Sequence, residues 1–418
     1  MRGPSAMRTL RRFGLPRVAG NGGLVGASVI DSLGTGLVLA FVLVYFARTT
    51  ELALPVIGGA LTLARLLAVP TAVTVGPLID RWGPRRLALA GNLISAVGYT
   101  GFLFSQQVWQ IVAAAWLAQV GAVTYWTSST GLVVLAADGA ERPRWFAMIH
   151  MLRNVGLGLG GALGAFLVGI GGTAGLRGVV AANAVSYLVA VLLLWRWRPA
   201  ARAVPGKAPA GGGYRTVLRD RRYLLLVAIN VCSVFSALIQ SLLVAVYITE
   251  GLHREAWIAG ALLVLNGAQV ALTQTLVSKW LERFRPTRVI AVACGINALA
   301  FGIFAVLTRT PGWAVPAGLF LAMLLYTLAE TAATPFAEEL SVSLAPEQLR
   351  GRYLAVYQLS WTLGQTVAPG LLTLLLAGGA TRPWLFLIGL SLAAVPALLL
   401  LERLTTTRPA PAELVAAA

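Results

Sequence analysis

The feature that most constrains this chain is a series of long apolar stretches that recur along its 418 residues. A helix needs roughly 20 mostly apolar residues to cross the hydrocarbon core of a bilayer, and within lipid only helices and closed barrels satisfy the backbone polar groups. Twelve stretches meet this requirement: about 22–46, 54–79, 86–105, 108–133, 146–171, 177–195, 223–248, 256–279, 288–307, 313–336, 353–376 and 383–401. The sequence therefore predicts an all-α membrane protein with twelve transmembrane helices.

The distribution of basic residues predicts how these spans are oriented. The formal charge of +18 comes from residues that lie between the apolar stretches rather than on one soluble region, which argues against nucleic acid as a partner. With the N-terminus inside, 26 of the 33 basic residues fall in cytoplasmic segments and five in the opposite loops. Because cytoplasmic loops carry an excess of Lys and Arg, we expect both termini in the cytoplasm and a multi-pass protein of the bacterial inner (plasma) membrane.

The longest loop divides the spans into two sets of six. Residues 196–222 contain several prolines and three consecutive glycines, which is typical of a linker. We expect an N-terminal six-helix bundle over 1–195 and a C-terminal six-helix bundle over 223–418. Similar motifs stand at matching points of these two pseudo-repeats: Asp-Arg-Trp-Gly-Pro at 80–84 and Glu-Arg-Phe-Arg-Pro at 282–286, Arg-Pro-Arg-Trp at 142–145 and Arg-Gly-Arg-Tyr at 350–353. Such repeats belong to transporters whose substrate site lies at the midplane between the halves.

Three segments resemble the major facilitator superfamily. The stretch Gly-Pro-Leu-Ile-Asp-Arg-Trp-Gly-Pro-Arg-Arg at 76–86 is similar to the signature loop between helices 2 and 3 of that family. The glycine-rich stretch at 156–164 is similar to the antiporter motif of its drug/proton branch, and the segment 329–353 is similar to multidrug exporters with an acidic residue in helix 10. The resemblance implies the major facilitator fold and an antiporter-type glycine motif formed by Gly156, Gly160, Gly161 and Gly164.

Two acidic residues lie deep inside predicted spans, Asp31 in the first and Glu330 in the tenth. Ionisable groups inside a membrane are costly and are therefore candidates for function, and a carboxyl group in a low-dielectric environment can load and release a proton near neutral pH. We expect Glu330 and Asp31 to couple transport to protons. The alternative is a structural ion pair, with Arg65 of the second span as the charge partner of Asp31. Arg153 lies near a span end, where a long side chain can reach the interface, and a structural role is favoured for it.

The loop after the second span is predicted to hold the two halves together. Asp80 lies near the expected start of the eleventh span, where its carboxylate would meet the positive end of a helix dipole. The neighbouring arginines would bridge to other helices, although the excess of positive charge on the cytoplasmic side also explains Arg85 and Arg86. A glycine at position 83 is expected to form a tight turn. The predicted conformational latch consists of Gly76, Asp80, Arg81, Gly83, Arg85 and Arg86.

Polar and aromatic side chains share single faces of several spans. Such polar faces either line a cavity or form hydrogen bonds between helices, and both interpretations are open for the seventh and eighth spans. Aromatic groups with few polar groups suit a lipophilic substrate. The candidate cavity-lining residues are Thr35, Trp116, Gln119, Trp126, Asn230, Gln240, Asn266, Gln269, Tyr326, Trp361 and Gln365.

The leading functional hypothesis is secondary active export of a small lipophilic compound, a drug or a secondary metabolite, in exchange for protons by alternating access. A proton-coupled uptake symporter for a small metabolite is one alternative, and a non-transporting sensor or a membrane enzyme is another. The two histidines, His150 and His253, are expected at opposite membrane faces without nearby ligands, and the sequence contains no Walker-type motif. We therefore expect no enzyme activity, no metal and no cofactor. The expected partners are protons, a small substrate and the lipid bilayer, with the chain acting as a monomer.

Overall fold

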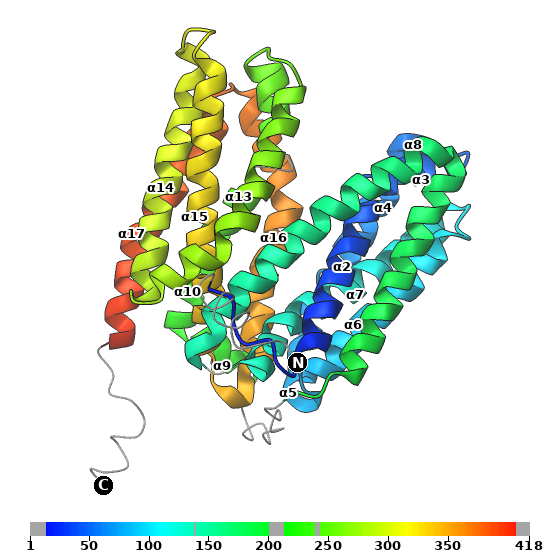
Figure 1. The fold of residues 1–418 in the computed structure, drawn as a ribbon, viewed down its shortest axis with the longest axis horizontal. Coiled ribbons are helices and arrows are strands. Elements are labelled where there is room, and N and C mark those ends of the chain that lie inside the picture. Colours follow the sequence, from blue (N-terminus) through cyan, green and yellow to red (C-terminus); the bar gives the residue numbers. More distant parts are fainter. Residues whose placement is uncertain (1–13, 138, 200–212, 239–242, 407–418) are drawn as a thin grey trace, which may run out of the picture.

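The computed structural model of the chain describes residues 14–137, 139–199, 213–238 and 243–406, and within these ranges the regular structure is helical. Figure 1 shows the helices in two groups. The first group contains α2 (Gly22–Leu39), α3 (Val42–Thr49), α4 (Leu54–Ala68), α5 (Thr71–Trp82), α6 (Pro84–Phe102), α7 (Val108–Ala136) and α8 (Arg142–Arg196). The second contains α9 (Tyr214–Arg219), α10 (Arg221–Ala237), α12 (Val244–Val246), α13 (Trp257–Leu281), α14 (Pro286–Val306), α15 (Val315–Ser343), α16 (Arg350–Ala377) and α17 (Arg382–Thr406).

The two groups contact each other at one end of the molecule, which we call the closed end. Here α5 packs against α16, α8 packs against α13 and α15, and α7 packs against α16 and α15 (lower end of Figure 1). The apolar core of the first group includes Val342 and Leu354 from the second group. Toward the opposite end the ribbons of the two groups diverge. The start of α2 and the end of α17 both lie at the closed end (Figure 1). That this end faces the cytoplasm is a prediction from the sequence.

The described residues contain eight helices that are long and apolar enough to cross a membrane, and the bent pair α4–α5 would make a ninth. The twelve predicted spans are thus not all recovered as separate apolar helices. The two spans expected at 146–171 and 177–195 correspond to the two arms of α8, which meet at Gly172, where the backbone leaves helical geometry. Gly172 has φ 52° and ψ −126°, a backbone conformation that favours glycine.

A break divides the second predicted span. The second span breaks between α4 and α5, which meet at 41°, because Pro70 has no N–H to continue the helical hydrogen bonds and its ring clashes with the preceding turn. The seventh span, expected at 223–248, contains α10 up to Ala237 and α12 from Val244, and residues 239–242 lie outside the described residues. Residues Tyr247–Gly251 form a π-helical turn. Ser236 and Ala237, at the end of α10, line the cavity described below.

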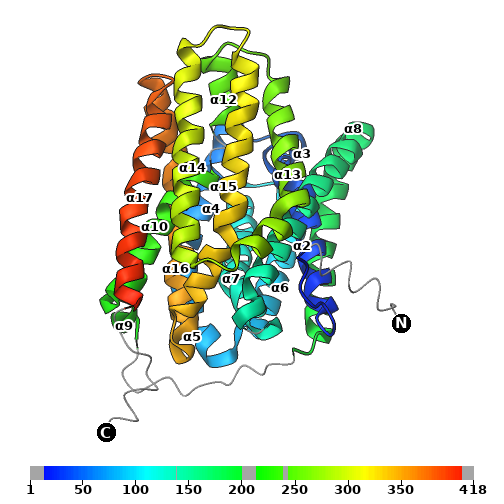
Figure 2. The ribbon, with the colours of Figure 1, turned by 60° about the vertical axis from the view of Figure 1, so that its left-hand side comes forward.

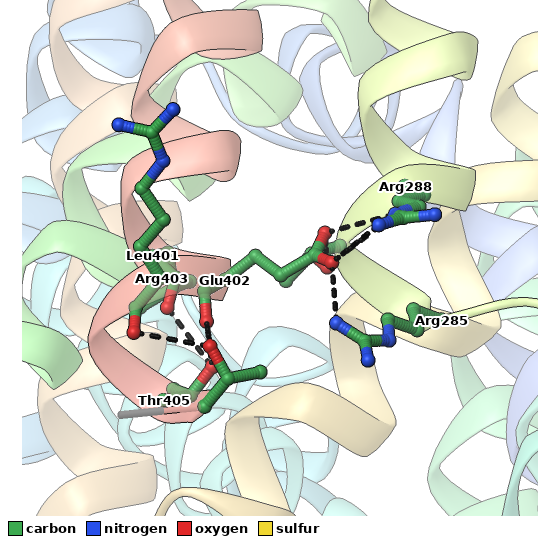
Figure 3. Close-up of polar contacts among 8 residues, drawn as sticks. Arg285, Arg288, Leu401, Glu402, Arg403 and Thr405 are labelled. Atoms are coloured by element: carbon green, nitrogen blue, oxygen red, sulfur yellow. Dashed lines mark hydrogen bonds and ion pairs between the residues drawn. The ribbon is translucent and has the colours of Figure 1, made fainter. Parts of the chain in front are cut away.

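Ion pairs join helices of the second group near the closed end. In both views α14, α15 and α17 lie side by side (Figures 1 and 2). Glu402 of α17 accepts hydrogen bonds from Arg285 at 2.7 Å and from Thr287 at 3.0 Å, and Arg288 pairs with the same carboxylate (Figure 3). Hydrogen bonds to a charged group are stronger than those between neutral groups. The cluster fixes the start of α14 to the end of α17.

Candidate functional site

A cavity of about 260 Å³ lies between the two groups of helices. The first group contributes residues of α2, α7 and the first arm of α8, and the second contributes residues of α10, α14, α15 and α16. The cavity is lined by the ionisable side chains of Asp31, His150, Arg153, Glu330 and Glu338 and by the aromatic side chains of Tyr125, Trp126, Phe146, Tyr326, Tyr357 and Trp361. It therefore combines groups that can exchange protons with aromatic surface that can contact an apolar compound.

A polar stripe on α15 forms one wall of this cavity. Tyr326, Glu330, Thr334 and Glu338 all line it, and their four-residue spacing places them on one face of the helix. The Glu330 carboxylate accepts a hydrogen bond from the Asn266 side chain at 3.1 Å. Its other oxygen lies 3.8 Å from Nε2 of His150, which belongs to the first group. Glu330 is thus held by its own group and faces the other group across the cavity.

The second predicted proton-coupling residue, Asp31, lines the opposite wall and is 3% exposed. Arg153 of α8 interacts electrostatically with Asp31. The Arg153 guanidinium lies over the Trp126 ring, 3.5 Å from the ring centroid. The sequence analysis gave Arg65 as a possible charge partner of Asp31 and favoured a structural role for Arg153 near the interface. In the structure, Arg65 is exposed on α4, whereas Arg153 faces the cavity.

Two ionisable cavity residues were missed from the sequence. His150 was expected at a membrane face without nearby ligands, but it lines the cavity opposite Glu330. Glu338 was left outside the tenth span, which was expected to end at 336, whereas α15 continues to Ser343. The spacing could have identified Glu338 as a cavity residue, because it follows Glu330 by eight residues and so falls on the same helical face.

The predicted lining residues are only partly brought together. Those that line the cavity are Trp126, Asn230, Tyr326, Trp361 and Gln365. Two others support helix contacts around it: Asn266 holds Glu330, and Gln269 donates to the Leu324 carbonyl oxygen at 3.1 Å. Thr35, Trp116 and Gln119 do not line the cavity. The Thr35 hydroxyl lies 3.3 Å from the Tyr187 hydroxyl. Gln240 lies outside the described residues.

Glycines bring α2 and α8 into close contact and so place Asp31 beside Arg153. A Cβ atom on Gly156 would meet Cβ of Ser32 at 2.8 Å, and one on Gly164 would meet the Leu37 carbonyl oxygen at 2.5 Å. Gly160 abuts the backbone of Leu33 in the same way. Of the predicted motif, Gly161 is the exception, since a Cβ there would make only an ordinary contact. Glycines four residues apart thus form the α2–α8 contact surface.

The predicted latch residue Asp80 meets the N-terminus of α16 at the closed end. Its side chain is 4% exposed and accepts hydrogen bonds from the Gly351 backbone N–H at 2.5 Å and from the Arg352 guanidinium at 2.7 Å. The first N–H groups of a helix lack intrahelical partners and carry partial positive charge. The Asp80 carboxylate therefore satisfies both a helix terminus and an arginine of the other group.

Small residues allow this contact. A Cβ atom on Gly76 would meet Cα of Arg352 at 2.9 Å, so α5 and α16 touch backbone to backbone. Tyr214, the first residue of α9 in the second group, donates a hydrogen bond to the Val73 carbonyl oxygen of α5. Burial raises the pKa of Tyr214 to about 12, so its hydroxyl remains a donor at physiological pH. Gly83 has φ 82° and forms the expected turn between α5 and α6.

The arginines of the predicted latch differ in their contacts. Arg85 donates to the carbonyl oxygens of Leu194, at 3.0 Å, and of Trp195, both at the end of α8 in its own group. Arg81 and Arg86 are exposed, and Arg81 lies 5.9 Å from the ring of the adjacent Trp82. The bridge between the groups is therefore made by Asp80, whereas Arg85 neutralises a helix C-terminus.

A second ion pair joins the groups at the closed end. Arg144 at the start of α8 binds Glu282 at the end of α13 through two hydrogen bonds of 2.6 Å each. In the internal repeat, Glu282 corresponds to Asp80 and Arg144 to Arg352. The residue that corresponds to Gly351 is Pro143, which has no N–H to donate. The two pairs are thus similar in position but differ in strength of contact.

The described residues contain no group of three His, Cys, Asp or Glu side chains that could hold a metal ion. The chemistry that the site residues themselves offer is the transfer of protons at carboxylates and the imidazole. These residues line the cavity between the two groups of helices.

The known proteins that this chain is similar to are membrane transporters. The family model of the Major Facilitator Superfamily matches residues 24–369 and again residues 229–417. A Na(+), Li(+), K(+)/H(+) antiporter of Planococcus maritimus is 23% identical over 370 residues, which cover 80% of this chain and 84% of that protein. Multidrug resistance protein MdtH of Edwardsiella ictaluri is 25% identical over 336 residues, covering 79% and 80%. Among solved structures, the proton:xylose symporter XylE matches with a TM-score of 0.72 at 15% identity, over 89% of this chain and 93% of that chain.

Proposed function

Because this chain belongs to the Major Facilitator Superfamily and is a multi-pass membrane transporter, we propose that it exports a small lipophilic compound in exchange for protons. The predicted family and the all-helical membrane fold are confirmed. The proposed setting is the bacterial inner membrane, with the closed end in the cytoplasm and the chain working as a monomer of two bundles, 1–195 and 223–418, joined by the 196–222 linker.

The observation that carries this proposal is the position of Glu330. Its carboxylate lines an aromatic cavity between the two groups, is held by Asn266 and faces His150. A carboxyl group in such a cavity can take up a proton from one side of the membrane and release it to the other when the groups rock. The multidrug relatives support export of a lipophilic compound.

The closed end supplies the second element of the mechanism. Asp80 and Glu282 each bind an arginine of the opposite group, and alternating access requires these contacts to break when the cavity opens to that side. We propose that they act as a conformational latch. Proton loading at Glu330 and Asp31 and substrate binding would then compete for the same cavity.

The test is transport in proteoliposomes with an imposed pH gradient, using ethidium and other fluorescent lipophilic compounds as probes. Glu330→Gln keeps an acceptor for Asn266 but carries no exchangeable proton. Gradient-driven flux should fall by about a hundredfold or more, the usual contribution of a positioned proton-transfer group.

The matched control is Glu51→Gln, an exposed acid outside the cavity, which should keep full flux. Full proton-coupled transport by the Glu330→Gln protein would refute the role of Glu330. No gradient-dependent flux of any probe in the wild type would refute the export of lipophilic compounds.

Exchange of a monovalent cation for protons is the second candidate. It is favoured by the antiporter relative and by three carboxylates in the cavity, those of Asp31, Glu330 and Glu338. Dequenching of a pH-sensitive dye on addition of NaCl, LiCl or KCl to the same proteoliposomes, without any lipophilic probe, would identify this activity.

A further inference from the structure

Glu338 presents a carboxylate to the cavity near the closed end. It belongs to α15 of the second group and accepts a hydrogen bond of 3.0 Å from the Thr130 hydroxyl of α7 in the first group. The next residue, Glu339, pairs with Arg142 at the closed end. Among the described residues Glu338 forms no ion pair. A carboxylate can accept about four hydrogen bonds, so the neutral Thr130 hydroxyl leaves most of this capacity unused.

The other two carboxylates of the cavity are less available to a bound compound. Glu330 accepts a hydrogen bond from the Asn266 side chain of its own group, and its role in the proposed function is to carry the proton. Asp31 is only 3% exposed. Glu338 is half-buried and lines the cavity where the walls of the two groups meet.

The charges of the cavity favour a cation as the bound compound. Three carboxylates line it, against one guanidinium, that of Arg153, and one imidazole. The Arg153 guanidinium lies over the Trp126 ring at 3.5 Å from the centroid, and within the described part of the chain it forms no ion pair with an acid. A carboxylate removed from water without a cationic partner is costly, and a bound cation would offset this cost at Glu338.

The surroundings of Glu338 suit an apolar body attached to that cation. On α7, Trp126 precedes Thr130 by four residues and Val133 follows it by three, so all three lie on one face, and all three line the cavity. From α16, Leu354 adds a further apolar side chain to the lining. Aromatic rings also attract cations through their faces. A lipophilic organic cation would therefore contact apolar surface and the Glu338 carboxylate at the same time.

We infer that Glu338 is the residue that selects the charge of the transported compound, by binding the cationic group of a lipophilic organic cation. This inference rests on the proposed function and divides the work between two carboxylates of α15: Glu330 carries the proton, and Glu338 binds the substrate. Thr130 and Glu338 belong to opposite groups, so opening of the closed end separates them. That movement exposes Glu338 to the side from which an exported compound enters.

The experiment compares two probes that share a triphenylphosphorus body and differ in charge, the cation methyltriphenylphosphonium and neutral triphenylphosphine oxide. Equilibrium dialysis against the purified full chain in detergent gives the Kd of each probe without any gradient. The wild type should bind the cation at least about tenfold more tightly than the neutral probe, because contacts to charged groups are the stronger ones.

Glu338→Gln keeps an acceptor for Thr130 but removes the charge. It should weaken binding of the cation by about tenfold or more and leave binding of the neutral probe unchanged. Glu338→Asp keeps the charge and should retain the preference for the cation. The control Glu51→Gln, an exposed acid outside the cavity, should behave as the wild type does.

Equal loss of both probes in Glu338→Gln, which a merely structural role would produce, would overturn the inference, and so would no loss of either. Equal affinity of the wild type for the two probes, or no binding of the cation, would overturn it without any variant. The flux assay separates the two proposals. Charge-selective binding in a protein that moves no probe would retain the role of Glu338 and reject export, whereas proton-driven flux of the cation at the wild-type rate and KM in Glu338→Gln would do the reverse.

Discussion

At the residue scale, Asp80 shows how one carboxylate can stabilise a conformation of the whole transporter. Its side chain is almost fully buried. It accepts hydrogen bonds from the Arg352 guanidinium and from the Gly351 backbone N–H at the N-terminus of α16. Removing one partner from a buried ion pair is strongly destabilising, because the remaining charge is left without compensation. Since all these partners belong to the other group, this stabilisation exists only while the closed end is shut.

Asp80→Asn should therefore shift the protein toward the state in which this end is open. Asn can still accept the Gly351 hydrogen bond but leaves Arg352 uncompensated, so we expect a loss of about 2 kcal/mol, roughly a thirtyfold change in the population ratio. Distances between spin labels placed on exposed positions of each group at this end would measure it. Arg81→Gln, an exposed neighbour on the same helix, is the control, and equal distance distributions in both variants would contradict the latch.

At the element scale, the packing of α2 against α8 depends on glycine at particular positions. A Cβ atom on Gly160 would overlap the Leu33 carbonyl oxygen, whereas one on Gly158 would meet nothing within 4 Å. Gly160→Ala should destabilise the protein by about 1–3 kcal/mol through overpacking. Gly158→Ala, two residues away, should be neutral or stabilise it by about 0.5–1 kcal/mol through the lower entropy of the unfolded chain.

Thermal unfolding of the two purified variants in the same detergent compares these effects. The midpoint temperature should fall for Gly160→Ala and hold or rise for Gly158→Ala. Equal midpoints for both variants would mean that α2 and α8 do not touch as described.

The helices also show which features of the fold and the site the sequence could predict and which it could not. Apolar length located most helices, and the spans expected at 146–171 and 177–195 correspond to the two arms of α8 that meet at Gly172. The break at Pro70 was not predicted, because it depends on local backbone geometry that hydropathy averages out. Asp31 and Glu330 were predicted because a charge in the middle of an apolar run is conspicuous. Glu338 and His150 were missed because they lie near the ends of predicted spans, where only the true helix length and the facing helix decide whether a side chain meets water or a cavity.

At the scale of the whole molecule, the internal repeat produces two ion pairs that close the same end. Asp80–Arg352 and Glu282–Arg144 occupy matching points of the two halves. They are not equal, because Gly351 donates a backbone hydrogen bond to Asp80 whereas Pro143 has none to offer. The side chains of the second pair are also more exposed, 30% and 18% against 16% and 4%, and exposed pairs contribute less.

This difference predicts an order of effects on the opening of the closed end. Glu282→Gln should shift the population ratio less than Asp80→Asn does, by about 1 kcal/mol or less. The two pairs join different helices, α5 to α16 and α8 to the end of α13, so the free-energy changes in the double variant should add to within about 0.5 kcal/mol. Spin-label distances at the closed end measure all three variants on one scale. A double variant that opens no further than Asp80→Asn alone would show that the pair in the second half does not hold this end closed, and that the repeat preserves its sequence without its function.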